Sequence, residues 1–205
     1  RTLGVNALAA VGCTGSIVFL IIGFAQGVSS GLAIVTARYF GAEDYDGVRR
    51  SFAANIVIAV AVTIVLTIIS VPATRWILEI MNTPAKIIDD AYSYLIIIFI
   101  GIFAVMTFNV LSNVLRALGD SRTPLIFLVI ASILNIILDF AFILGLNIGV
   151  AGAALATVIS QIVSGVLCII YIAKKFPILH VKKSDFKLTN SEIIQHLSVG
   201  MPMGF

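Results

Sequence analysis

The sequence predicts an all-α integral membrane protein, a polytopic bundle of about five transmembrane helices with the start of a sixth. Of its 205 residues, 60% are hydrophobic and only 11% are charged, whereas a soluble domain carries about 25% charged residues. The mean hydropathy is +1.13. The Lys and Arg residues lie between the apolar stretches, which is the pattern of membrane proteins. The net charge of +3 is too small to indicate nucleic-acid binding.

Five stretches contain no Asp, Glu, Lys or Arg apart from Asp139, and each is long enough to cross a bilayer as a helix of about 20 residues. We expect these helices at roughly 3–37, 51–74, 91–115, 123–146 and 149–173, with a sixth beginning near His196. We expect residues 1–175 to form one transmembrane bundle. Residues 176–195 then form a linker, and residues 196–205 begin a second bundle.

Local signals support each helix in turn. The first contains Gly23, Gly27 and Gly31 at a spacing of four, a smooth stripe that lets another backbone approach closely. The second and third are apolar runs bounded by charged loops. Pro124 suits the first turn of the fourth. The uncharged, glycine-containing sequence LGLNIGVAGA joins the fourth and fifth as a tight antiparallel hairpin.

The basic residues orient the bundle. Ten of the thirteen Lys and Arg residues lie in the segments 38–50, 116–122 and 174–195, and the other three are Arg1, Arg75 and Lys86. Because cytoplasmic loops carry the excess of Lys and Arg, these three segments should be cytoplasmic. The first helix then starts outside the cell, so we expect at least one further helix before Arg1 in a multi-pass plasma-membrane protein, the inner membrane in a bacterium.

Asp139 is the only charge between Arg122 and Lys174. A charged side chain at the centre of a bilayer costs about 2.5–3.5 kcal/mol on insertion scales, and such residues usually serve a function. Asn135 lies one helical turn earlier and shares its face. We therefore expect Asp139 to bind a coupling proton or Na⁺. The alternative is an acid satisfied by neighbouring polar groups that never titrates.

The fifth helix presents a second polar pair, Thr157 and Gln161. At a rise of about 1.5 Å per residue, Asp139 and Thr157 lie at the same distance from the hairpin turn. Asn135 and Gln161 lie together at a greater distance from it. We expect these four side chains to form a polar patch in the outer half of the membrane.

Asn109 and Asn113 form a further pair on the third helix, but their depth places them in a lower layer, nearer the cytoplasm. Tyr94 matches the depth of the outer patch, although a tyrosine of the interfacial belt is the simpler interpretation. His180 and His196 are isolated in the linker region and are expected to face solvent.

Four stretches in this order resemble the multidrug and toxic compound extrusion (MATE) family: VNALAAVG, GVSSGLAIVTARYFGAEDYDGVRRS, NVLRALGDSRTP and NIILDFAFILGLNIGVAGAALATVISQ. The prokaryotic branch that includes DNA-damage-inducible protein F is the most similar. The resemblance implies two six-helix lobes around a central cavity. It also implies export of cationic or amphipathic compounds in exchange for H⁺ or Na⁺, with no other cofactor. The chain would then lack the first helix of the N-terminal lobe and most of the C-terminal lobe.

The resemblance also implies a polar site in the N-terminal lobe. Asn135, Asp139 and Thr157 match its Asn, Asp and Thr, and Asn109 matches an asparagine of the same network. The Asp that the family places on its first helix falls outside this sequence.

Two other functions remain open. A flippase for lipid-linked precursors or a polysaccharide exporter of the same broad fold would need a more cationic cavity, and no Lys or Arg falls within the five predicted helices. A membrane scaffold would not need a buried acid such as Asp139. The sequence contains no nucleophile triad, phosphate-binding glycine loop or metal cluster, so we do not expect an enzyme.

Overall fold

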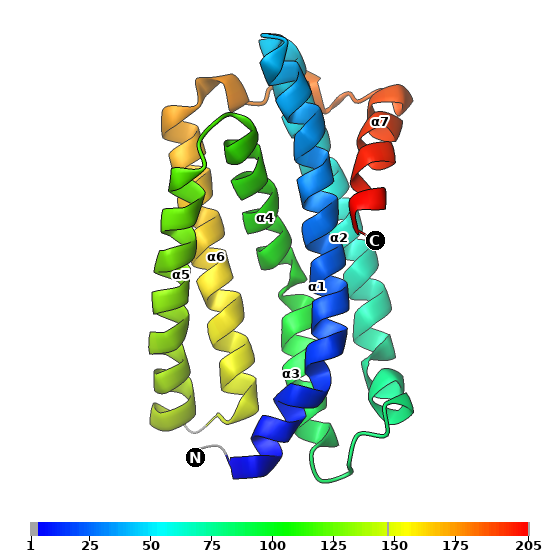
Figure 1. Cartoon of the computed structure of the whole chain (residues 1–205), viewed down its shortest axis with the longest axis vertical. Helices are drawn as coiled ribbons and strands as arrows, with labels where there is room; N and C mark the ends of the chain where they lie inside the picture. Colours follow the sequence, from blue (N-terminus) through cyan, green and yellow to red (C-terminus); the bar gives the residue numbers. More distant parts are fainter. Residues whose placement is uncertain (1–3, 147, 205) are drawn as a thin grey trace.

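The structure is a computed structural model that describes residues 4–146 and 148–204, and every regular element in these ranges is helical (Figure 1). The α-helices are α1 (Gly4–Gly41), α2 (Tyr45–Ile80), α3 (Ile88–Ile100), α4 (Ile102–Ala117), α5 (Arg122–Phe140), α6 (Val150–Lys175) and α7 (Asn190–Gly200). The shorter elements are the π-helix η1 (Ala141–Gly145) and the 3₁₀ helices η2 (Pro177–Leu179), η3 (Lys183–Phe186) and η4 (Pro202–Gly204). Arg1, which the charge count places outside the cell, lies beyond the described residues.

The long helices lie side by side and confirm the predicted bundle. Four of them are long and apolar enough to cross a membrane: α1, α2, α5 together with η1, and α6. The bent pair α3–α4 makes a fifth span. Figure 1 shows the α1–α2 turn, the α4–α5 turn and the segment after α6 at the same end of the bundle. We call this end, which carries residues 38–50, 116–122 and 174–195, the basic end.

The third predicted helix is not continuous. It is divided into α3 and α4, which meet at Gly101 and bend by 42°. A Cβ on Gly101 would collide with Cγ2 of Val158 and lie 3.1 Å from the carbonyl oxygen of Ile97. Helix α6 therefore passes this point closely, and only a glycine provides the space for the bend.

Several helix ends differ from the prediction for local reasons. Helix α2 begins earlier because the Asp44 side chain accepts a hydrogen bond from the Gly47 N–H and caps it. Helix α7 begins at Asn190, before His196, because Thr189 and Glu192 form a capping box. Beyond Phe140 the fourth span continues as the π-helix η1.

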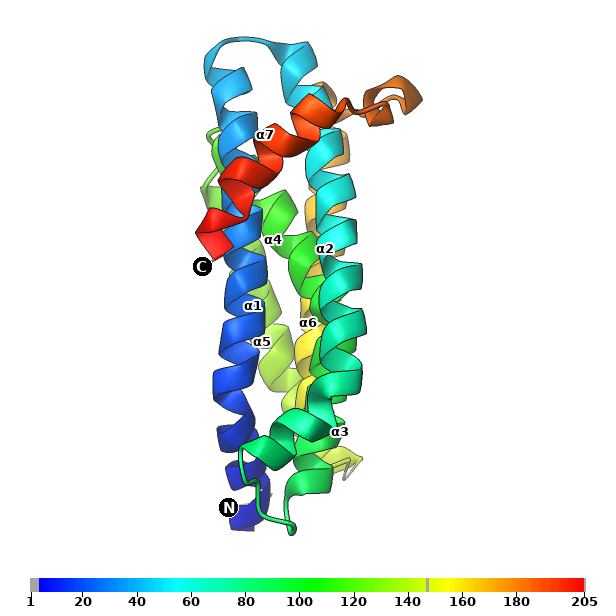
Figure 2. The ribbon, with the colours of Figure 1, turned by 90° about the vertical axis from the view of Figure 1, so that its right-hand side faces the viewer.

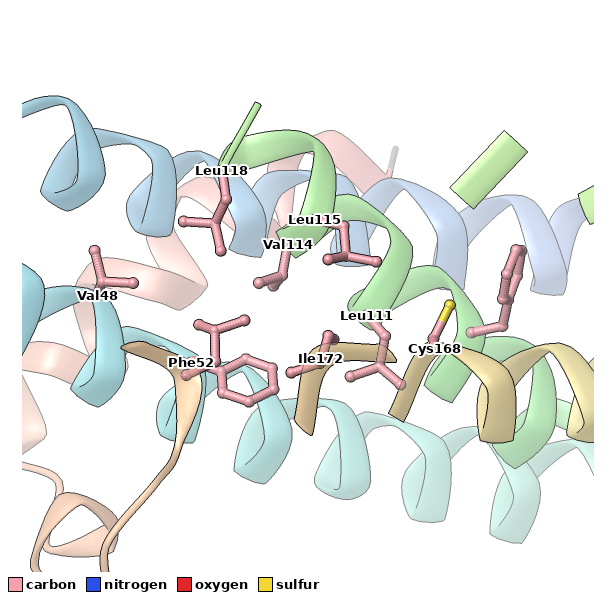
Figure 3. Close-up of a cluster of buried hydrophobic side chains, with 10 residues drawn as sticks. Val48, Phe52, Leu111, Val114, Leu115, Leu118, Cys168 and Ile172 are labelled. Carbon is pink, nitrogen blue, oxygen red and sulfur yellow. The ribbon is translucent and has the colours of Figure 1, made fainter. Parts of the chain in front are cut away.

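Apolar side chains from α2, α4 and α6 fill the core at the basic end (Figure 3). Leu179 of η2 is 2% exposed and joins this cluster, so the segment after α6 is anchored to the bundle. Two further clusters lie along the bundle. One joins α1 with α2 and α4, and the other centres on α3.

Helix α7 lies across α1 and α2 at the basic end (Figure 2). The predicted glycine stripe makes this contact possible. A Cβ on Gly27 would collide with the carbonyl oxygen of Met203, and one on Gly31 would lie 2.6 Å from Cα of Gly200. Gly23 has nothing within 4 Å of its Cβ position, so only Gly27 and Gly31 serve the predicted packing role.

Candidate functional site

The α5–α6 hairpin brings Asn135 and Thr157 together. The side-chain amide of Asn135 donates to the Thr157 hydroxyl over 3.4 Å, and that hydroxyl donates to the Ala153 carbonyl over 3.0 Å. Both side chains are half-buried. The hydroxyl thus accepts one bond and donates one, and the carbonyl oxygen of the Asn135 amide takes no part in this pair.

Asp139 lies one turn beyond Asn135, near the end of α5 opposite the basic end. Its Oδ1 atom is buried and has no hydrogen-bond partner among the described residues. Tyr94 of α3 lies within electrostatic range of the carboxylate.

The pairing across the hairpin differs from the prediction. Asp139 was expected beside Thr157 and Asn135 beside Gln161, but Asn135 is the residue that bonds Thr157. The π-helix η1 lies between Asn135 and the hairpin turn, so the α-helical rise of about 1.5 Å per residue used in the prediction does not apply along the whole of this stretch.

A second polar region lies nearer the basic end, where α1, α4, α5 and α6 enclose a cavity of about 280 Å³. Its polar lining consists of Gln26, Ser30, Asn109, Ser112, Asn113, Arg116 and Gln161. The Asn113 amide donates to Ser30 over 3.3 Å, and Arg116 donates to Asn113 over 3.3 Å. Asn109 and Asn113 thus lie in a layer separate from Asp139, as their depth predicted, and Gln161 belongs to that layer.

The sequence reasoning missed Arg116 and Ser112 as cavity residues. Arg116 was placed in a loop because the third helix was expected to end at residue 115, but α4 continues to Ala117. Asn109, Ser112, Asn113 and Arg116 follow one another at the spacing of a single helix face, and that pattern could have identified both. The cavity therefore contains one cation, which the sequence analysis did not expect.

The expectation that His196 faces solvent is wrong. Its side chain is 1% exposed and forms hydrogen bonds to α2 and to its own helix, whereas His180 is exposed as predicted. The error arose because α7 begins before His196 and packs onto the bundle.

The outer layer supplies hard oxygen donors: a carboxylate, an amide carbonyl and a hydroxyl, from Asp139, Asn135 and Thr157. Such oxygens suit a proton shared with the carboxylate or an alkali cation such as Na⁺. Within the described part of the chain, no three His, Cys, Asp or Glu side chains gather in a group that could hold a metal ion. The donor set consists of oxygens alone, from a carboxylate, an amide and a hydroxyl.

Comparisons with known proteins agree with this architecture. The MatE family model matches residues 1–141. "Probable multidrug resistance protein YpnP" of Bacillus subtilis is 33% identical over 172 residues, which cover 84% of this chain and 39% of that protein. Multidrug export protein MepA of Staphylococcus haemolyticus is 30% identical over 185 residues, which cover 90% of this chain and 40% of that protein.

A solved structure, the inward-facing conformation of a multidrug resistance MATE family transporter of the MOP superfamily, superposes with a TM-score of 0.92. It is 29% identical, and the match covers 98% of this chain and 46% of that one. The chain thus spans less than half the length of the relatives that it matches.

Proposed function

The chain belongs to the MatE family, and from this premise we propose that it is part of a cation-coupled multidrug efflux antiporter. The transporter would export cationic or amphipathic compounds in exchange for H⁺ or Na⁺. Both relatives described above are named for multidrug resistance or export, which supports the substrate class.

The observation that carries the proposal is the Asp139 carboxylate. It lies within a membrane-spanning element, its Oδ1 atom is buried, and no described residue satisfies that oxygen. A carboxylate oxygen buried without a partner is costly in a membrane, and a bound proton or Na⁺ removes the cost. Asn135 lies on the same helix as Asp139 and bonds Thr157 of the neighbouring α6, and under the proposal these two residues would supply further oxygens for the ion.

The proposed coupling follows from the position of these residues across two helices. Ion binding at Asp139 changes the charge between α5 and α6 and so changes which packing of the two helices is favoured. A transporter that alternates between two packings of its helices can use this difference to release its substrate on one side of the membrane.

Efflux of ethidium from vesicles that contain the full-length protein tests the proposal. Wild type and Asp139→Asn are compared under an imposed pH gradient and then under an imposed Na⁺ gradient. We expect Asp139→Asn to abolish efflux driven by one of the two gradients, because a neutral amide cannot exchange the ion. The gradient that loses its effect identifies the coupling ion.

Asp90→Asn is the matched control, because it makes the same change at an exposed position in the first turn of α3. It should retain wild-type efflux. Equal efflux by wild type and Asp139→Asn under both gradients would show that Asp139 is only a structural acid.

A second candidate function is export of a lipid-linked precursor or polysaccharide. Arg116 favours it, because this guanidinium lines the cavity near the basic end and could bind a phosphate. Under this alternative, Arg116→Gln would abolish export of the phosphate-bearing substrate, and Asp139→Asn would leave it unchanged. A single cation among six amide or hydroxyl side chains is a weak phosphate site, so we prefer drug efflux.

A further inference from the structure

Buried hydrogen bonds connect α7 to the helix pair α1–α2 at the basic end. The Asn55 amide donates to Thr36 over 2.9 Å, Thr36 and Ser51 share a bond of 2.9 Å, and Ser51 bonds Nε2 of His196 over 2.8 Å. Each of these four side chains is at most 2% exposed. The chain therefore links three helices through side chains that are almost fully buried.

The partners fix the direction of these bonds. Nδ1 of His196 lies 2.7 Å from the Glu192 carbonyl, which can only accept, so Nδ1 carries the proton. In the neutral ring, Nε2 then accepts from Ser51, Ser51 accepts from Thr36, and Thr36 accepts from Asn55. Each hydroxyl donates once and accepts once. Both hydroxyls and both ring nitrogens are paired in this way only while the His196 ring is neutral, and Oδ1 of Asn55 has no hydrogen-bond partner among the described residues.

Protonation of His196 would reverse the donor–acceptor direction of some of these hydrogen bonds. Nε2 would become a donor, so Ser51 would have to turn its hydrogen towards Thr36. The Thr36 hydroxyl would then lose Ser51 as the acceptor for its own hydrogen. A charge would also be buried with no carboxylate in contact with the ring. Both effects disfavour the packed state of α7.

The charged groups around the ring are already committed or distant. On α7, the Glu192 carboxylate bonds the Thr189 N–H and hydroxyl and forms a 2.8 Å ion pair with Arg50 of α2. His196 and Ser51 line a cavity of about 180 Å³ together with Asp44 and Asp46, before and within α2, and Tyr39 of α1. Neither aspartate bonds the ring. The Arg50 charge at the same cavity further opposes a charged His196.

Burial lowers the pKa of His196 below its ordinary value, and the Glu192 carbonyl and carboxylate only partly oppose this effect. Helix α7 is not among the candidate membrane spans. Because the pKa is depressed in the packed state, the contribution of His196 to packing is fully present above the ordinary pKa of about 6.5. It is lost progressively as the pH falls from that value towards the depressed pKa.

We propose that His196 is a pH-sensitive latch that holds α7 on the α1–α2 pair while neutral and releases it when protonated. The close glycine contact between Gly31 and Gly200 seats α7 on α1, and the buried hydrogen-bonded chain fastens it to α2. Since the segment after α6 leads into α7, acidification of the cytoplasmic side would free the helix that follows the linker.

The distance between spin labels on α7 and on the α4–α5 turn tests the latch in the full-length protein. Ile194 and Ser121 are both exposed and serve as label positions after the native cysteines are replaced by alanine. We expect one short distance at about pH 8 and a growing population of longer distances towards about pH 5. The ratio of released to packed α7 should rise up to about tenfold per pH unit between the two pKa values.

His180→Gln is the matched control, because it removes the exposed histidine of the same region. It should respond to pH like the wild type, whereas His196→Gln should keep the short distance at both pH values. A wild type whose distances do not change with pH, or a His196→Gln variant with the wild-type response, would overturn the latch.

Ser51→Ala decides the case if His196→Gln fails to pack at any pH. Removing the hydroxyl that donates to Nε2 makes protonation of the ring easier, so the midpoint of release should move to higher pH. An unchanged midpoint would contradict the proposal. None of these readouts involves transport. The latch can therefore fail while the proposed antiport stands, and the antiport can fail while the latch stands.

Discussion

At the scale of single residues, Arg49 joins the segment after α6 to the bundle. Its guanidinium bonds Asp185 over 2.7 Å and Asp46 over 2.8 Å, but the Asp185 side chain is 6% exposed and that of Asp46 is 81% exposed. The Lys182 N–H holds the pKa of Asp185 below its usual range, with burial opposing and Arg49 adding to the effect. The buried carboxylate is therefore the partner that anchors the segment.

Asp185→Asn should loosen this segment at neutral pH. The amide cannot pair with Arg49, so trypsin should cut at Lys182 and Lys183 several-fold faster than in the wild type. In the wild type the ion pair stabilises the anchored segment fully above the unfolded-state pKa of Asp185, about 3.9. This stabilisation is lost as the pH falls through the depressed pKa of Asp185 in the folded protein. Digestion of the protein in nanodiscs, followed by mass spectrometry, measures the rate.

Asp46→Asn is the matched control for this substitution, because it removes the exposed partner of the same arginine. An exposed ion pair contributes little to stability, so the cleavage rate should stay close to that of the wild type. Equal acceleration by both substitutions would show that burial of Asp185 is not what anchors the segment.

At the scale of helices, the glycine stripe of α1 provides an internal comparison. A Cβ on Gly31 would lie 2.6 Å from Cα of Gly200 and 2.7 Å from the Val199 carbonyl oxygen, both backbone atoms that cannot yield easily. Gly23, two turns earlier on the same helix, has nothing within 4 Å. The two positions share a helix and a spacing but differ in what they touch.

Gly31→Ala should therefore destabilise the protein by about 1–3 kcal/mol through overpacking. Gly23→Ala should leave it unchanged or stabilise it by about 0.5–1 kcal/mol, because alanine favours the helix. Both variants are heated in detergent, and the fraction of protein that stays monodisperse at each temperature gives the melting temperature. Equal melting temperatures for Gly31→Ala and the wild type would contradict the close approach of α7 to α1.

At the scale of the whole molecule, hydropathy and charge were enough to predict the bundle, its five spans and the end at which the basic segments gather. These properties depend on composition along the chain, which a membrane constrains strongly. The bend at Gly101 was not predicted, because it depends on how closely α6 passes the third span. Helix length alone cannot report that distance.

The candidate site was predicted only in part, for a related reason. The lone charge of Asp139 and the spacing of Asn135, Thr157 and the α4 asparagines identified the polar residues. Their pairing depends on how α5 and α6 pack on each other, which a count of residues along the hairpin does not capture, so the hydrogen bond to Thr157 comes from Asn135. His196 was missed because its burial comes from packing between segments far apart in the sequence.

The central claim is that Asp139 binds the coupling ion and gives it up when a substrate binds. The most direct measurement is the release of protons, or of ²²Na⁺, when ethidium is added to the purified full-length protein in weakly buffered detergent solution. We predict that the wild type releases one of these ions and that Asp139→Asn releases neither while still binding ethidium. Equal release by Asp139→Asn and the wild type would contradict the claim.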